Sequence, residues 1–306
     1  MKRKHIRIKQ VDAFTTSPFS GNPAVVVMEA DGLTDEEMLL IARETNAAGT
    51  VFVMASGKTE ADFSLRFFTI QTEIDLCTHA AVAAFHALIE DGRIWPRKAK
   101  MNVLLETGAG LLPVEMFFEN GRLQSTMITQ VSPGFASVEL EVDEIADILG
   151  IRPLEIRDTG MPVEMAFTGL WHLIVPIKNM GTFSSLKPDF ERLETINRER
   201  GILSTQLFCM ETIEKESIVH TRNFTPATGI REHGVTGDAN GALGCYLVKN
   251  RVVEVPTGKV FLVAEQGIET GRPGKVNIEI TVVKEKVAAV RVGGTAVTVM
   301  DGVMRL

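Results

Sequence analysis

Apolar and polar residues alternate along many short stretches of the chain, which predicts β-strands with one buried face. In the first half we expect strands at residues 6–14, 23–28, 51–54, 63–68, 101–106 and 112–117. In the second half the same pattern predicts strands at 163–168, 171–177, 206–213, 217–222, 259–265, 276–284 and 287–292. Pro133-Gly134 lies between the two series, so we expect the boundary between the halves near residues 120–135.

Five segments have helical patterns, at residues 35–45, 79–90, 143–149, 188–200 and 238–248. Thr34 and Glu37 form a capping box before the first of them. The second and the last are rich in Ala, Gly and other small residues, which let surrounding strands approach closely. We therefore expect antiparallel strands to wrap one central helix in each half, which makes the fold α+β. A dinucleotide-binding fold is not expected, because no G-x-G-x-x-G follows a strand and opens a helix.

The two small-residue helices follow two copies of one short pattern. Arg66-x-Phe68-Thr69 recurs as Arg222-x-Phe224-Thr225, an offset of 222 − 66 = 156 residues. Each copy leads through an irregular stretch into its helix. This repeat predicts two similar lobes with a site between them. Because helix N-termini present backbone N–H groups and a positive dipole end, such a site would suit an anion.

Composition and charge limit the classes of partner. The net charge of −7 and the pI near 5.5 argue against a nucleic-acid or anionic-membrane partner. No stretch approaches 18 apolar residues, and the basic N-terminus is expected to be a strand and not a signal peptide. The three cysteines are widely spaced and form no C-x-x-C, which favours a reducing cytoplasm over a zinc or dithiol site.

Four stretches spanning nearly the whole chain carry a family resemblance. They are 11–26, 69–80, 168–176 and 222–237. The second contains Glu73-Ile74-Asp75-Leu76-Cys77-Thr78-His79-Ala80, and the fourth contains Arg222-x-Phe224-x-Pro226 and Val235-Thr236-Gly237. In this order they resemble the PhzF-like isomerases of phenazine biosynthesis, within the diaminopimelate epimerase-like superfamily.

The resemblance implies two pseudo-symmetric lobes, each an antiparallel β-barrel around a central helix, with the site in the cleft. We expect residues 1–125, completed by the C-terminal strand 295–306, to form the N-terminal lobe. Residues 126–294 would form the C-terminal lobe.

The chain departs from the family at three site positions. The family's general-base Glu is replaced by Gly49, a site Asp by His233, and the Gly before the site His by Thr78. Of the family's titratable site residues only His79 is kept. A proton-shuttling isomerase needs a positioned acid or base. We therefore expect negligible turnover of the phenazine precursor dihydro-hydroxyanthranilate.

His79 and His233 are the candidate catalytic residues, since an imidazole exchanges protons near neutral pH. We expect them to face each other across the cleft, although His233 could instead lie in a surface loop. Cys77 could act as a base at a helix N-terminus, but a buried structural cysteine is the better interpretation.

The start of each small-residue helix supplies the candidate substrate-binding residues, which are Gly49, Cys77, Thr78, Gly237, Asp238 and Ala239. Asp238 is expected to be the N-cap of the second helix. There its carboxylate would compete with an anionic ligand for the same N–H groups.

The function expected from this sequence is a cofactor-independent isomerase or epimerase of a small carboxylate, in a biosynthetic process. No nucleotide or metal motif is present, so no cofactor is expected. The alternative is a catalytically degenerate family member that serves as a small-molecule binding or assembly protein. The expected partner is the small-molecule substrate, with no nucleic acid and no membrane, and a homodimer is left open.

Overall fold

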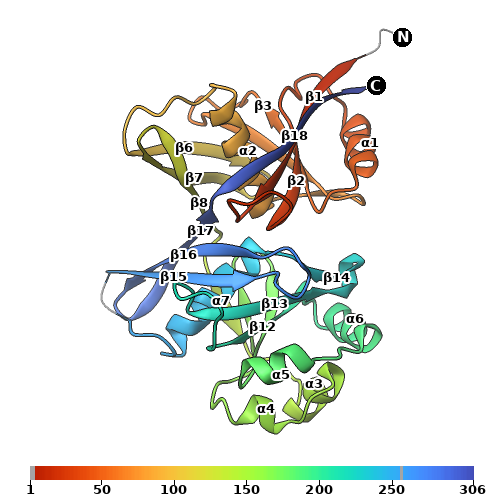
Figure 1. The fold of residues 1–306 in the computed structure, drawn as a ribbon, viewed down its shortest axis with the longest axis vertical. Coiled ribbons are helices and arrows are strands. Elements are labelled where there is room, and N and C mark those ends of the chain that lie inside the picture. The colour runs from red at the N-terminus through yellow and green to blue at the C-terminus, as the bar shows by residue number, and fades with distance from the viewer. Residues whose placement is uncertain (1–3, 256–257) are drawn as a thin grey trace. The chain divides into compact units, whose positions relative to one another are not determined.

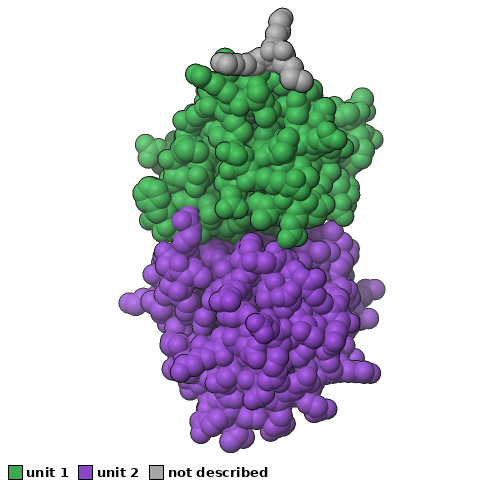
Figure 2. Space-filling model, turned by 90° about the vertical axis from the view of Figure 1, so that its right-hand side faces the viewer, with its two compact units in different colours: residues 1–129, 293–306 green, residues 130–292 purple. Residues whose placement is uncertain are grey.

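The computed structural model describes residues 4–255 and 258–306, which form two compact units. Unit 1 consists of residues 1–129 and 293–306, and unit 2 of residues 130–292 (Figures 1 and 2). Among the described residues, no helix is both long and apolar enough to cross a membrane.

The described residues of unit 1 include the helices α1 (Asp35–Thr45) and α2 (Thr78–Glu90). Its strands are β1 (His5–Ala13), β2 (Asn22–Val27), β3 (Thr50–Met54), β4 (Phe63–Phe68), β5 (Glu73–Ile74), β6 (Lys100–Thr107), β7 (Gly110–Glu119), β8 (Arg122–Thr129) and β18 (Ala296–Arg305). The last strand pairs antiparallel with the first, from His5 opposite Arg305 to Ala13 opposite Ala296 (Figure 1).

Unit 2 contains the helices α3 (Val142–Leu149), α4 (Leu154–Arg157), α5 (Met180–Ser185), α6 (Phe190–Glu199) and α7 (Gly237–Lys249), and the short 3₁₀ turn η1 (Pro226–Thr228). Its strands are β9 (Gly134–Ala136), β10 (Glu164–Phe167), β11 (Trp171–Pro176), β12 (Ser204–Cys209), β13 (Val219–Thr225), β14 (Ile230–His233), β15 (Gly258–Gln266), β16 (Gly274–Val283) and β17 (Lys286–Gly294). The last two residues of β17 belong to unit 1.

Both units pair their strands in the same order. In unit 1, β1–β2 is antiparallel, β2–β3 parallel, β3–β4 and β4–β5 antiparallel, β4–β6 parallel and β6–β7 antiparallel. In unit 2 the same sequence of pairings runs through β10–β11, β11–β12, β12–β13, β13–β14, β13–β15 and β15–β16.

The expectation of purely antiparallel pairing is wrong at four places. The pairs β2–β3, β4–β6, β11–β12 and β13–β15 are parallel. Each parallel pair is joined by a connection that contains one or two helices. A connection of a dozen or more residues with a helix returns the chain to the same end of the sheet, so the next strand runs parallel.

The two small-residue helices are buried along almost their whole length, as their composition predicts. Helix α2 packs against β1, β2, β3, β8 and β18, and α7 packs against β10, β11, β12 and β16. In α7 the glycines permit the close approach. A Cβ added at Gly241 would lie 2.6 Å from Val292 Cγ2, and one at Gly244 would lie 2.7 Å from Ile278 Cγ2.

The repeated Arg-x-Phe-Thr pattern forms a clamp on the hairpin that precedes each central helix. In unit 1, Arg66 Nε and Nη2 donate to the two carboxylate oxygens of Glu73 at 2.7 and 2.6 Å. The guanidinium carbon lies 5.4 Å from the centre of the Phe68 ring. The Thr69 hydroxyl accepts from the N–H groups of Gln71 and Thr72, which closes the turn between β4 and β5.

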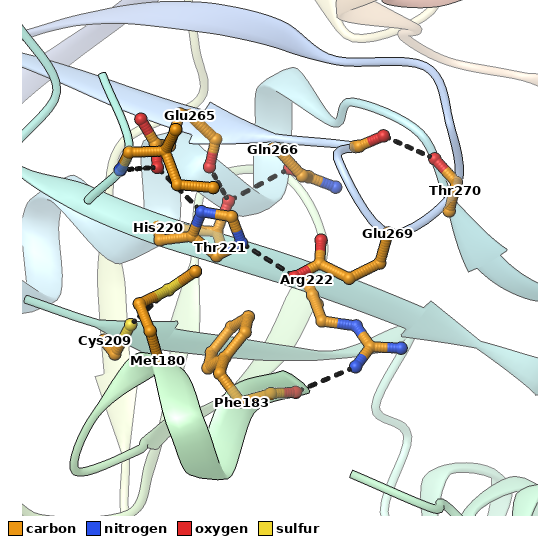
Figure 3. A network of polar contacts seen from close by, with 12 residues as sticks. Met180, Phe183, Cys209, His220, Thr221, Arg222, Glu265, Gln266, Glu269 and Thr270 are labelled. Carbon is orange, nitrogen blue, oxygen red and sulfur yellow. Dashed lines mark hydrogen bonds and ion pairs between the residues drawn. The ribbon is translucent and has the colours of Figure 1, made fainter. Parts of the chain in front are cut away.

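Unit 2 repeats the clamp with a more buried pair. Arg222 donates to both carboxylate oxygens of Glu232 at 2.7 and 2.8 Å and lies 5.1 Å from the Phe224 ring centre. Its third contact, Nη1 to the Phe183 carbonyl at 3.1 Å, ties β13 to the α5 segment (Figure 3). The repeat is therefore explained by the fold, because both copies fix the strand hairpin from which a central helix begins.

Local signals at the helix ends are mostly confirmed. Thr34 and Glu37 form the capping box at α1 as expected, and Gly150 ends α3 in the left-handed conformation. The expectation that Asp238 caps α7 is wrong. The helix begins at Gly237 with Thr236 as its N-cap, and the Thr236 hydroxyl donates to Gln266 Oε1 at 3.1 Å. Asp238 therefore lies in the first turn.

The same Glu→Gln substitution in the two arginine–glutamate clamps should cause unequal losses of stability. The Glu232 side chain is 16% exposed and that of Glu73 is 43% exposed. Glu232→Gln leaves a nearly buried arginine without its charge partner, so it should lower the free energy of unfolding by about 2–3 kcal/mol. Glu73→Gln should lower it by about 1 kcal/mol or less, because water screens the exposed pair. Urea unfolding followed by circular dichroism measures both, and equal losses would contradict the argument.

Candidate functional site

The start of α2 brings a thiol and an imidazole together. Cys77 is the N-cap residue, and Thr78 and His79 open the first turn. Cys77 Sγ lies 3.3 Å from His79 Nδ1, within hydrogen-bonding distance for sulfur. His79 is buried, whereas Cys77 is partly exposed. A thiol at a helix N-terminus beside an imidazole is the environment that activates cysteines.

The expectation that Cys77 is buried is wrong, because this residue is partly exposed. Cys209 and Cys245 are the buried ones. Burial raises the pKa of both thiols to about 12, so neither is ionised near neutral pH. Cys77 escapes burial because it precedes the helix, whereas Cys245 lies inside α7 and Cys209 lies in β12.

Gly49 completes the cluster in unit 1. A Cβ at this position would lie 3.0 Å from His79 Nε2 and 3.1 Å from Cys77 Sγ. These distances are shorter than an ordinary contact of about 3.5–4 Å between such atoms. The missing side chain at Gly49 thus leaves room for the Cys77–His79 pair. The structure brings together three residues that sequence analysis singled out separately.

In unit 2, His233 and Asp238 lie near the start of α7. His233 ends strand β14 opposite Asn223 on β13, so it is not in a surface loop. Burial lowers the pKa of His233 while the charge of Asp238 opposes that effect, so His233 is neutral near pH 7. Gly237 and Ala239 are buried, and the side chain of Asp238 is partly exposed.

Sequence analysis missed a second histidine beside Asp238. His172, on strand β11, is 1% exposed and points Nε2 at Asp238 Oδ2 across 3.6 Å. Its Nδ1 lies 2.7 Å from the Ser204 hydroxyl on the neighbouring strand β12. Burial lowers the pKa of His172 despite the nearby Asp238, so this imidazole is neutral as well. The available signal was a histidine inside an otherwise apolar strand, Trp171–Pro176.

A third histidine of unit 2 has a structural role. His220 on β13 is fully buried between two carboxylates, with Nδ1 2.7 Å from Glu265 and Nε2 2.9 Å from Glu269 (Figure 3). Burial lowers its pKa, but the hydrogen bonds to Glu269 and Glu265 outweigh burial and raise the pKa overall. Glu265 also accepts from the N–H groups of Ile213 and Glu214, so this network fastens the β12–β13 connection.

His79 belongs to unit 1 and His233 to unit 2, and the expectation that they face each other stays a prediction. Two further carboxylates have structural contacts, since Asp12 accepts from the Phe19 N–H and Glu73 binds Arg66. Within residues 4–255 and 258–306, no group of three or more His, Cys, Asp and Glu side chains is placed to hold a metal ion.

Comparisons with known proteins show to which family this chain belongs. A family model described as phenazine biosynthesis-like protein, PhzC-PhzF, matches residues 11–302. An uncharacterized isomerase of Clostridium acetobutylicum is 34% identical over 301 residues, which cover 98% of this chain and 97% of that protein. A PhzF-family phenazine biosynthesis protein of Bacillus anthracis has a solved structure that is 34% identical, with a TM-score of 0.88 and coverage of 98% of this chain and 99% of that one.

More distant structures share the fold alone. A hydroxyproline epimerase from Agrobacterium vitis is 13% identical, with a TM-score of 0.69 over 100% of this chain and 93% of that one. The α+β class expected from the sequence is confirmed, and so is the family resemblance. Because the family model and the relatives match nearly the whole chain, the protein belongs to the PhzC-PhzF family of phenazine biosynthesis-like proteins.

Proposed function

We propose that this protein is a cofactor-independent isomerase or epimerase that moves a proton on a small carboxylate substrate. Its family and the naming of its relatives as uncharacterized isomerases support this reaction class. An isomerisation needs a group that removes a proton from carbon and a group that returns one, with no change in composition. The open question is which residues do this in a chain with Gly49 at the position of the family's Glu.

The observation that carries the proposal is the Cys77–His79 contact against Gly49. We assign proton transfer in unit 1 to this pair. The imidazole takes the thiol proton, and the thiolate then accepts the proton from the substrate carbon, or the imidazole accepts it directly. The electron pair of the broken C–H bond passes to the substrate carboxylate or a conjugated double bond. Returning a proton at the other face or another carbon completes the isomerisation.

The start of α2 suits the substrate's carboxylate. The first turn is Thr78-His79-Ala80-Ala81, without an acidic side chain, so no carboxylate of its own competes for the positive end of the helix. Negative charge that develops during proton removal would be stabilised by the same end of the helix. Thr78 contributes its backbone at the helix start, and Gly49 contributes space. Neither supplies a titrating group.

His233 is our candidate for the second proton-transfer residue. Its neutral imidazole can accept a proton, and Asp238 stabilises the charged form that results. We further infer that each unit is one lobe, a β-barrel around α2 or α7, supported by the identical order of strand pairing in the two units. The proposal also includes a small-molecule substrate as the only required partner and a cytoplasmic location.

Hydrogen exchange at carbon tests the proposed reaction. In D₂O we expect the protein to exchange the carbon-bound hydrogen next to the carboxylate in at least one acid of a panel of 2-amino, 2-hydroxy and unsaturated acids, measured by proton NMR. Cys77→Ser and His79→Asn should each slow that exchange by about 10²–10⁴-fold, because each removes an acid–base group.

Cys209→Ala is the matched control, since it removes a buried thiol and should leave the rate unchanged. If both site variants exchange as fast as the unmodified protein, the assignment to this pair is wrong. If the unmodified protein exchanges none of the acids, the isomerase proposal is contradicted, and a small-molecule binding role becomes the better explanation.

Gly49→Ala tests the geometry of the pair without changing its chemistry. The added methyl must displace His79 or Cys77 by a few tenths of an ångström. Because misplacement of this order disturbs a catalytic contact, we expect exchange to slow by about tenfold or more. Gly57→Ala is the control, since a Cβ there meets nothing within 4 Å. An unchanged rate in Gly49→Ala would show that the pair does not depend on this space.

A further inference from the structure

His220 on β13 lies between two carboxylates, which accept hydrogen bonds and donate none (Figure 3). Its Nδ1 lies 2.7 Å from Glu265 Oε1, and its Nε2 lies 2.9 Å from Glu269 Oε1. Because each ring nitrogen must donate to a carboxylate, both carry a hydrogen and the ring is a charged imidazolium. The proposed proton transfers do not use this fully buried side chain. Its charge therefore calls for another role.

Glu265 fixes one side of His220 to the sheet. The two residues are direct neighbours in the parallel pairing of β13 and β15. Both oxygens of Glu265 also accept from backbone N–H groups, those of Ile213 at 2.7 Å and Glu214 at 2.8 Å. This carboxylate thus keeps donors of its own even without the imidazolium.

Glu269 ties the other side of His220 to a turn. The connection between β15 and β16, residues 267–273, has no strand or helix and is called here the β15–β16 turn. It is closed on itself, because the Arg272 N–H and the Thr270 hydroxyl both donate to the Gly267 carbonyl, at 2.8 and 3.0 Å. The turn is therefore compact, and the Glu269 side chain connects it to β13.

The end of β15 and the start of this turn contact the segment that leads into α7. Gln266 Oε1 accepts from the N–H of Thr236 at 3.2 Å and from its hydroxyl at 3.1 Å. At the next residue, Gly267, an added Cβ would lie 2.8 Å from the Gly234 carbonyl oxygen. The turn thus packs directly against the backbone of the residue that follows His233.

Neighbouring elements add further ionisable groups. Arg222 on β13 lies close enough to attract the Glu269 carboxylate. Cys209 on β12 stays neutral because burial raises its pKa to about 12, and Glu211 adds a negative charge near that thiol from the β12–β13 connection. From α5 the uncharged Phe183 ring packs edge-on against the imidazole, with 5.1 Å between ring centres. The acceptor for Nε2 is the carboxylate of Glu269.

The contact between His220 and Glu269 depends on pH at both ends. Burial lowers the pKa of His220, but its hydrogen bonds to Glu269 and Glu265 outweigh burial and raise the pKa overall. Burial raises the pKa of Glu269, but the hydrogen bond from His220 outweighs it and lowers the pKa overall. The contact is complete between these two pKa values. When the pH rises through the raised pKa of His220, the ring loses one N–H, and Glu269 is released because Glu265 keeps its backbone donors.

We propose that His220 and Glu269 position His233 for its proton transfer, by holding the β15–β16 turn against Gly234. This inference rests on the proposed function, in which His233 is the second proton-transfer residue. Both are positioning residues, which act through the backbone that carries His233. Proton transfer in unit 2 would then require a charged His220.

Histidine side-chain NMR over a pH series tests the proposal without requiring turnover. The signals of His220 and His233 are identified by their absence from His220→Asn and His233→Asn. At pH 7 we expect both ring nitrogens of His220 to be protonated. At higher pH we expect His220 to lose a proton and the His233 signals to shift in the same step, because the turn is released. His233 has no step of its own there, since burial lowers its pKa.

A neutral His220 ring at pH 7, or His233 signals that stay constant while His220 loses its proton, would overturn the positioning role. A merely structural His220 would lower stability without linking the two titration curves. The unmodified protein suffices for this measurement, so the proposal is tested even where a variant does not fold.

Substitutions of Glu269 test the same role by activity. Glu269→Ala should remove the shared step from the His233 signals and slow hydrogen exchange at pH 7 by about tenfold or more, because His233 is misplaced. Glu269→Gln keeps an oxygen that accepts from Nε2 and should retain most of the rate. Glu216→Ala is the control, since it removes an exposed carboxylate that pairs with Lys275 and should change neither readout.

The two proposals fail separately. If exchange is present and Glu269→Ala leaves both the rate and the shared step unchanged, the positioning role is overturned and the isomerase stands. If the unmodified protein exchanges none of the acids while His233 still follows the titration of His220, the isomerase is contradicted and the positioning of His233 by this pair is supported.

Discussion

Two bidentate arginine–glutamate pairs fix the places from which both central helices begin. Arg66 with Glu73 and Arg222 with Glu232 lock a strand hairpin, and in each unit the chain leaves that hairpin directly into α2 or α7. Planar guanidinium and carboxylate groups match in geometry as well as charge, so the pair fixes orientation as well as distance. The candidate residues Cys77, His79, His233 and Asp238 lie within a few residues of these two helix starts.

The two helix starts share this support but differ in their side chains. At α2 an uncharged first turn, the Cys77–His79 pair and the empty space of Gly49 suit an anion and a proton transfer. At α7 the first turn contains the carboxylate of Asp238, which lies 3.6 Å from His172. The repeated pattern thus provides one scaffold twice, with different side chains in the first turn of each helix.

What the sequence predicted well was local. The capping box of α1 and the buried, small-residue character of α2 and α7 depend on neighbours within one or two helical turns, so they were visible without a structure. The Arg-x-Phe-Thr repeat was also visible, but its partners Glu73 and Glu232 lie seven and ten residues further on, at different spacings. The role of the pattern could therefore not be deduced from the repeat alone.

The features that the sequence predicted poorly depend on contacts between distant segments. Parallel pairing depends on which way each helical connection returns, and the room for the Cys77–His79 pair depends on Gly49 in a distant segment. The His172 side chain contacts Ser204, 32 residues away, and faces Asp238 on another element. The sequence analysis placed the N-cap of α7 at the wrong residue. The Thr236 hydroxyl binds Gln266 on β15 instead of its own helix, and rules based on neighbouring residues cannot predict such a contact.

The central claim is that the Cys77–His79 pair, and not a carboxylate, is the reactive centre of this family member. Alkylation by iodoacetamide at neutral pH, with peptide mass spectrometry to locate the label, tests it most directly. The account predicts that the folded protein is labelled first at Cys77, well ahead of Cys209 and Cys245, and that His79→Asn slows labelling of Cys77 without affecting the other two. Labelling of Cys77 that is as slow as that of the buried cysteines, or that is unchanged in His79→Asn, would contradict the account.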